Sequence, residues 1–386
     1  MSVTAAAGFR AGGVTAGLKA SGRPDVALVR NDGPLWHAAG VFTSNRVQAA
    51  PVVWSRQVLA DGRLDAVLLN SGGANACTGP EGFADTHRSA EHVAGVLGVA
   101  AGDVAVCSTG LIGERLPMDL LLAGVDAAAA GLSPEPAGGS AAAQAIMTTD
   151  TVPKTAAVTD PAGWTVGGMA KGAGMLAPGL ATMLVVITTD AVASPAELDA
   201  ALRAATRVTF DRIDSDGCMS TNDTVLLLAS GASGVTPPAP ALAAAVTQVC
   251  AQLARALIGD AEGASHDIAV QVVNAASEDD AVEVARAVTR SNLFKAAVFG
   301  KDPNWGRVLA AVGTTAAAFD PLTLDVAING IQVCRACGVG DDRALVDLSG
   351  REVQVVVDLH AGPATATVWT NDLTHDYVHE NSAYST

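Results

Sequence analysis

Short apolar runs alternate along the chain with longer segments of helical periodicity. The runs are rich in Val, Leu and Ile and predict strands at 25–29, 52–54, 66–69, 184–188, 225–228, 268–273 and 353–359. The longer segments, with apolar positions three and four residues apart, predict helices at 80–97, 195–205, 239–257 and 277–291. Strands and helices that follow one another in groups indicate a layered α/β protein.

The strength of the pattern varies along the chain. The clearest helix is 278–288, where Glu278, Asp279 and Asp280 occupy the first turn and an apolar stripe follows. Acidic residues near a helix N-terminus and one apolar stripe are typical of a helix packed on a sheet. Residues 123–145 are instead rich in Ala, Gly, Ser and Pro, and we expect a loose connection or surface excursion there.

Composition narrows the class of protein. The 386 residues suffice for one large domain or two modest ones. Hydrophobic residues make up 49% of the chain, charged residues 16% and aromatic residues 4%, so small aliphatic side chains must build the interior. The net charge of −16 argues against a nucleic-acid or anionic-membrane partner, because either would require a basic face.

Cysteine usage and the N-terminus favour a cytoplasmic protein. The N-terminus lacks the basic-then-apolar layout of a secretion signal, and no unbroken apolar run approaches the roughly 18 residues that cross a bilayer. Cys334 and Cys337 have zinc-ribbon spacing without a second pair or a nearby His, so we expect no metal. The cysteines are scattered without a compact framework, at positions 77, 107, 218, 250, 334 and 337.

One junction carries candidate chemistry. Gly172, Gly174 and Gly179 precede Thr182, and the apolar run 183–187 follows it at once. If the bond between Ala181 and Thr182 were cut, the new α-amine could act as the base for the Thr182 hydroxyl. Pattern alone favours an ordinary glycine-rich loop that leads into a core strand.

The sequence around this junction resembles the ornithine acetyltransferase family, also called glutamate N-acetyltransferase, whose members cleave themselves before the Thr of an Ala-Thr-Met-Leu motif. Further blocks of the chain are similar to this family, so the likeness spans nearly the whole sequence. These blocks are Asn70 to Gly79, Ser108 to Gly113, Ser220 to Thr224, Asp302 to Arg307 and the tail from Asn381 to Thr386.

The resemblance implies a fold and a maturation step. The fold is a sandwich of two β-sheets covered by helices, of the kind shared with DmpA-like enzymes. Self-cleavage would give an α chain, 1–181, and a β chain, 182–386, which form one intertwined catalytic unit. Two copies of each chain are expected in the assembly.

The resemblance also implies the site residues. Thr182 is the nucleophile, and Thr109 with Gly110 forms the oxyanion hole, whose hydroxyl and backbone N–H suit a developing negative charge. Thr149 stays open as an alternative to its neighbour Thr148. The substrate-binding residues are Thr148, Lys171, Thr182, Glu262, Asn381 and Thr386.

The implied reaction moves the acetyl group of N-acetylornithine to Thr182, releases ornithine, and passes the acetyl group to glutamate, without metal or bound cofactor. Some members also accept acetyl-CoA as donor, which the sequence leaves open. One alternative is an amidohydrolase or aminopeptidase with the same Thr182 chemistry, and another is a non-catalytic binding protein for amino acids. Lys171, Glu262 and the tail favour an amino-acid acceptor site and therefore the transferase.

The chain departs from the family at a few positions. Gly73 stands where other members often carry Asn, and Gly179 where they often carry Asn or Asp. Cys218-Met219 stands where they often carry Asp-Thr. None of these changes removes the nucleophile, an oxyanion donor or Lys171. We expect no catalytic histidine, and His266 and His379 to be packing or surface residues.

Overall fold

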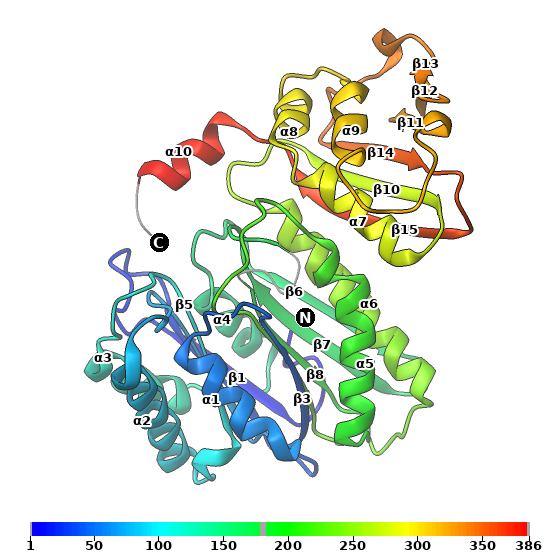
Figure 1. The fold of residues 1–386 in the computed structure, drawn as a ribbon. Helices are drawn as coiled ribbons and strands as arrows, with labels where there is room; N and C mark the ends of the chain where they lie inside the picture. The colour runs from blue at the N-terminus through cyan, green and yellow to red at the C-terminus, as the bar shows by residue number, and fades with distance from the viewer. Residues whose placement is uncertain (1, 178–182, 384–386) are drawn as a thin grey trace. The chain divides into compact units, whose positions relative to one another are not determined.

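The computed structural model describes residues 2–177 and 183–383, which form two compact units (Figure 1). The first unit contains the described residues up to Asp211 together with Cys218–Leu257. The second unit contains Arg212–Gly217 and the described residues from Ile258 onward. The predicted cut site, Ala181-Thr182, lies outside the described residues, within the sequence range of the first unit.

Two sheets build the first unit. One has the order β1-β2-β4-β5, with β4 and β5 parallel, and its strands are β1 (Phe9–Val14), β2 (Val26–Asn31), β4 (Ala66–Ser71) and β5 (Val104–Thr109). The other has the order β3-β9-β8-β7-β6, with β8 and β9 parallel. Its strands are β3 (His37–Phe42), β6 (Lys154–Asp160), β7 (Trp164–Lys171), β8 (Leu184–Thr189) and β9 (Thr224–Ala229).

The two sheets share one apolar core. Val29 and Leu69 of the first sheet and Val186 and Leu228 of the second belong to the same buried cluster. The outer face of the first sheet is covered by α1 (Ala50–Val58), α2 (Gly79–Leu97) and α3 (Met118–Ala130). The other sheet carries α5 (Pro195–Val208) and α6 (Ala239–Gly259), as Figure 1 shows. The predicted sandwich of two helix-covered sheets is therefore confirmed.

The second unit holds a third sheet that the sequence did not separate from the sandwich. Its order is β13-β12-β11-β14-β10-β15, and α7 (Glu278–Thr289) packs on β10 and β15. α8 (Asn292–Phe299) and α9 (Trp305–Val312) follow, and α10 (His375–Ala383) closes the described chain. The strands are β10 (Asp267–Ala275), β11 (Asp325–Ile328), β12 (Ile331–Arg335), β13 (Gly338–Val339), β14 (Glu352–Asp358) and β15 (Ala364–Asn371).

The expectation of a loose connection over 123–145 is wrong. This stretch contains the end of α3 and all of α4 (Pro136–Ala145). Its small residues allow close packing rather than looseness: a Cβ on Gly124 would meet Ala16 and Val26, and one on Gly138 would meet the backbone oxygen of Ala11. Helices of Ala and Gly can therefore lie directly on the β1–β2 edge of the sheet.

The strand predicted at 52–54 is also wrong. These residues lie in α1, which begins after Ala49 with Pro51 in its first turn, a position where Pro is favoured. Val52 and Trp54 are buried, and Trp54 Nε1 donates to Val104 O over 3.0 Å. A short apolar run does not distinguish a buried strand from a buried helix.

Helix α6 is apolar over a longer stretch than any unbroken apolar run in the sequence. Its most apolar 18-residue window has a mean hydropathy of 1.5, enough by length and composition to cross a membrane. Half of that window is buried inside the protein, and Gly168 of β7 lies against its Val249 and Leu253 side chains. A core helix of this kind passes the same test, so the helix is weak evidence for a membrane span.

Candidate active site

Thr109 and Gly110 lie where β5 ends against a second glycine-rich turn. The amides of Gly72 and Gly73 both donate to Thr109 O, each over 3.0 Å. Gly110 has φ +131°, and a Cβ there would lie 2.5 Å from Gly73 N. Only glycine fits such a backbone approach without displacement. The predicted oxyanion pair therefore sits on a fixed, closely packed turn.

Lys171 meets the predicted oxyanion pair directly. It is the last residue of β7, its side chain is buried, and its Nζ donates to Thr109 Oγ1 over 2.9 Å. An ammonium can only donate, so Thr109 Oγ1 accepts and its hydroxyl hydrogen points to another acceptor. A developing oxyanion is an acceptor of that kind.

Asp150 connects Lys171 to the predicted substrate contact Thr148. Asp150 Oδ2 accepts Thr148 N over 2.9 Å, and Oδ1 accepts Gly172 N over 2.7 Å and Lys154 Nζ over 2.5 Å. Burial alone would raise the pKa of this carboxyl, but the charges of Lys171 and Lys154 and the Gly172 amide lower it overall. Asp150 is therefore a buried anion between two cations.

Lys19 adds a third cation near the same segment. Its Nζ donates to Met147 O over 2.7 Å, directly before Thr148. Burial lowers the pKa of Lys19 to about 8, with the neighbouring charge of Asp25 acting in the opposite direction. Lys19 belongs to a loop between β1 and β2, and its sequence context carried no sign of this position.

Asn222 connects β5 with the segment that precedes β9. Its Nδ2 donates to Ser108 O over 2.8 Å and to Ala74 O over 2.6 Å. Ser108 Oγ in turn donates to Asn70 Oδ1 over 2.6 Å. The Ser220 to Thr224 block, noted in the sequence without a role, is thus in contact with the backbone next to Thr109.

Glu262 and Asn381 meet in the second unit. Asn381 of α10 donates its Nδ2 to Glu262 Oε2 over 2.9 Å. Glu262 also borders a cavity of about 170 Å³ in this unit. Lys295 lines the same cavity, is buried, and has its pKa lowered by burial. The remaining lining residues are Ser215, Asp216, Asn292, Asp372, Leu373 and Tyr377.

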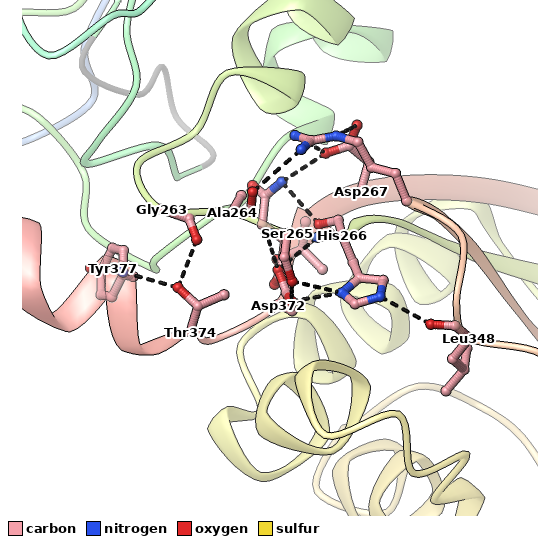
Figure 2. A network of polar contacts seen from close by, with 12 residues as sticks. Gly263, Ala264, Ser265, His266, Asp267, Leu348, Asp372, Thr374 and Tyr377 are labelled. Atoms are coloured by element: carbon pink, nitrogen blue, oxygen red, sulfur yellow. Dashed lines mark hydrogen bonds and ion pairs between the residues drawn. The ribbon is translucent and has the colours of Figure 1, made fainter.

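A polar network holds the turn that carries Glu262 (Figure 2). Asp372 accepts the backbone amides of Ser265 and His266, each over 2.9 Å, and lies 2.7 Å from His266 Nδ1. His266 Nε2 lies 3.2 Å from Leu348 O. Both ring nitrogens are therefore engaged by structural partners, which makes His266 a packing histidine, as expected.

The start of α10 closes the other side of this network. Thr374 Oγ1 donates to Gly263 O over 2.6 Å and accepts Tyr377 N over 2.9 Å. Gly263 has φ +60°, and a Cβ there would meet the backbone of Asp376 and Tyr377. The turn that follows Glu262 is thereby fixed to the helix that carries Asn381.

The predicted site residues fall into two groups. Thr109, Gly110, Thr148 and Lys171 lie together in the first unit, and Glu262 and Asn381 meet in the second. Ala181, Thr182 and Thr386 lie outside the described residues. Sequence reasoning assigned no role to the described residues around these groups, which are Lys19, Asp150, Lys154, Asn222 and Lys295.

Cys334 and Cys337, the pair with zinc-ribbon spacing, differ in their surroundings. Cys334 is buried with its Sγ 3.7 Å from Leu324 O, whereas Cys337 is exposed. Over the described ranges, no group of three or more His, Cys, Asp or Glu residues is placed to hold a metal ion.

Comparison with known proteins assigns the family. The profile of the ArgJ family matches residues 10–386. The arginine biosynthesis bifunctional protein ArgJ of Streptomyces coelicolor is 70% identical over 385 residues, with both chains fully covered. The protein of the same name from Thermobifida fusca is 64% identical over 386 residues, again with full coverage of both.

Two solved structures are also similar to this chain, over about half of its length. An ornithine acetyltransferase of Mycobacterium tuberculosis, complexed with ornithine, is 62% identical, with a TM-score of 0.46, and the match covers 47% of this chain and 96% of that one. The ArgJ protein of Bacillus halodurans is 38% identical, with a TM-score of 0.43, and covers 48% of this chain and 95% of its own. The family match and the full-length relatives are decisive, and this chain belongs to the ArgJ family.

Proposed function

We propose that this protein is the acetyltransferase of arginine biosynthesis that moves the acetyl group of N-acetylornithine to glutamate through an acetyl-Thr182 ester. The Thr182 hydroxyl attacks the acetyl carbonyl while the α-amine takes its proton. The carbon–nitrogen bond breaks, and ornithine leaves with a proton. The α-amine of glutamate then attacks the ester, which gives N-acetylglutamate and restores the hydroxyl.

The observation that carries this proposal is the hydrogen bond from Lys171 Nζ to Thr109 Oγ1. It connects the strand that ends before the predicted nucleophile with the predicted oxyanion pair. It also directs the Thr109 hydroxyl hydrogen away from Lys171, toward an acceptor such as the tetrahedral oxyanion. Gly110 N–H supplies the second donor, and removal of one such donor typically costs about 100- to 1000-fold in rate.

We further propose that the protein matures by self-cleavage. Thr182 Oγ attacks the carbonyl of Ala181, the acyl group shifts from nitrogen to oxygen, and water hydrolyses the ester. The products are chains 1–181 and 182–386, which together form one catalytic unit. Two copies of each chain in the assembly are part of the same proposal.

Substrate recognition is assigned to the two groups of site residues. The cations around Asp150, with Lys171 foremost, suit an amino-acid carboxylate, and Thr148 lies beside them. Glu262, held by Asn381, suits an ammonium group. Thr386 completes the substrate-binding set. Acetyl-CoA is proposed as an additional donor because it could acetylate Thr182 without a dedicated phosphate loop.

Intact mass measurement with N-terminal sequencing tests the nucleophile and the maturation together. A chain that begins at Thr182 is the expected result, and Thr182→Ala should remain one full-length species. Cleavage and activity retained in Thr182→Ala would refute the mechanism.

Ornithine release separates the transferase from a hydrolase that uses the same nucleophile. The transferase should release ornithine from N-acetylornithine in strict dependence on glutamate. Equal release without glutamate would instead identify water as the acceptor. The same assay with labelled acetyl-CoA and glutamate measures the additional donor activity directly.

A further inference from the structure

Asp223 is a buried carboxyl that contacts Met183, the residue after Thr182, and the proposed transfer assigns it no role. It directly precedes β9, and Met183 directly precedes the neighbouring parallel strand β8. Met183 N donates to Asp223 Oδ1 over 3.1 Å, and Thr224 N donates to Met183 O over 3.1 Å. Residues 223 and 224 therefore hold both backbone polar groups of Met183.

This contact lies next to the reacting atoms by covalent connection. Met183 N is bonded to the carbonyl carbon of Thr182, and only two covalent bonds separate it from Thr182 Cα. Thr182 Cα bears both the nitrogen of the scissile peptide bond and the side chain with the attacking hydroxyl. A group that accepts a hydrogen bond from Met183 N is therefore only a few covalent bonds away from the reacting atoms of Thr182.

The second carboxyl oxygen of Asp223, Oδ2, is buried. The side chain is 0% exposed, and Oδ2 has no hydrogen-bond partner in the structure as described. An ionised carboxylate oxygen in this state would be costly. Protonation removes the charge and converts the oxygen into a donor.

Burial outweighs the charges and hydrogen bonds around Asp223 in setting its pKa. Burial raises its pKa well above the usual range of a carboxyl, and Asp211 adds to the rise. The Met183 amide, Ser220 and Lys171 act in the opposite direction without offsetting burial. Burial and the unpartnered Oδ2 therefore both favour the protonated form of the carboxyl.

We propose that Asp223 delivers a proton to the nitrogen of Thr182 during self-cleavage, an inference that rests on the proposed maturation. Thr182 Oγ forms a bond to the Ala181 carbonyl carbon, and the Ala181–Thr182 carbon–nitrogen bond breaks. The electron pair of that bond stays on nitrogen, which takes the proton of Asp223 Oδ2. The proton released by the hydroxyl returns to Asp223, so the carboxyl ends neutral and nothing is oxidised.

Asp223→Asn is the discriminating variant. Its amide oxygen can still accept Met183 N–H, but its nitrogen cannot deliver a proton. Asp190→Asn is the matched control, because Asp190 follows the opposite end of β8, is buried, and accepts the amides of Ala7 and Thr165. Asp223→Ala removes both the acceptor and the proton.

The measurement follows loss of the full-length chain after cell-free synthesis, with thermal unfolding as the check on folding. Cleavage in Asp223→Asn should slow by about 100- to 10,000-fold, the usual range for general acid–base catalysis, while Asp190→Asn cleaves at the wild-type rate. A wild-type cleavage rate in Asp223→Asn would overturn the inference. This holds even if Asp223→Ala cleaves slowly, because Asp223 would then only position Met183.

The wild-type pH profile keeps the inference testable if Asp223→Asn does not fold. The cleavage rate should fall at alkaline pH as Asp223 loses its proton, which gives the profile a descending limb. A rate that rises steadily through the alkaline range would contradict the inference. Failure of the wild-type chain to cleave at all would instead refute the proposed maturation, so the two failures are distinguishable.

Discussion

At the residue scale, the first unit concentrates cations around one anion in a strongly acidic protein. Lys171 and Lys154 flank the buried Asp150, and Lys19 lies by the same segment. Asp150 and Asp25, which lies by Lys19, offset two of the three positive charges and leave the cluster positive overall. A substrate carboxylate is therefore favoured at this position although the whole chain carries a charge of −16.

Thr109→Ala tests whether the Thr109 hydroxyl stabilises the transition state. We expect kcat/KM for acetyl transfer to fall by about 100- to 1000-fold, because one oxyanion donor is lost. Thr109→Ser keeps the hydroxyl and should retain most of the activity. A Thr109→Ala enzyme within tenfold of wild type would exclude the hydroxyl as an oxyanion donor.

Lys19 should make stability depend on pH in a defined window. Its pKa is about 8 in the folded protein and 10.5 as the ordinary value, so the unfolded chain binds more protons between these limits. The cost of burying the ammonium is fully present below pH 8 and disappears as the pH rises toward 10.5. The urea midpoint should therefore rise relative to Lys19→Gln across this window.

This comparison is best made in the Thr182→Ala background, which we expect to remain one chain. Lys301→Gln serves as the control because Lys301 is exposed. A difference between wild type and Lys19→Gln that stays constant from pH 8 to 10.5 would contradict the lowered pKa.

At the scale of elements, the end of β5 depends on a glycine-to-glycine approach. Gly110 lies against the backbone of Gly72 and Gly73, whose amides donate hydrogen bonds to Thr109 O. The pleated strand alone does not fix the direction of the Thr109 side chain. The approach between the two turns holds the backbone that carries Thr109, and Lys171 Nζ holds its hydroxyl oxygen.

Gly110→Ala should be more destabilising than Gly113→Ala. Gly113 also has a positive φ, +89°, but a Cβ there would meet nothing within 4 Å, so its replacement should cost only about 1–3 kcal/mol of backbone strain. Gly110→Ala adds the contact with Gly73 N and must displace a turn. Urea unfolding measures both, and equal costs would contradict the close approach.

Much of the fold could be predicted because buried strands such as β8 and β9 are continuous apolar runs. The errors have physical reasons: a three-residue run around Trp54 fits a helix as well as a strand, and Ala and Gly over 123–145 pack closely instead of loosening the chain. Thr109 and Lys171 could be proposed as site residues from motifs. Asp150 and Asp223 could not, because their roles come from burial and partners far away in the sequence.

At the scale of the whole molecule, the second sheet combines strands from both sides of the predicted cut. β3, β6 and β7 precede it and β8 and β9 follow it, in the order β3-β9-β8-β7-β6. β7 pairs with β8 from Lys171↔Leu184 to Val166↔Thr189. Neither product would contain the complete sheet or the complete core.

We therefore expect the two products to remain associated after cleavage. Chains 1–181 and 182–386 should elute together in size-exclusion chromatography and separate only in denaturant. Thr182→Ala should elute at the same position as one uncut chain. Separation of the products in native buffer would show that the β7–β8 pairing and the shared core do not hold them.

The shared sheet also determines what heat or denaturant would do to the mature enzyme. Refolding of the uncut chain would be a unimolecular process, because all of its strands belong to one polypeptide. After cleavage, recovery would require two separate polypeptides to find each other, so its yield would depend on protein concentration and compete with aggregation. A mature enzyme of this kind would be protected by slow unfolding rather than by reversible refolding.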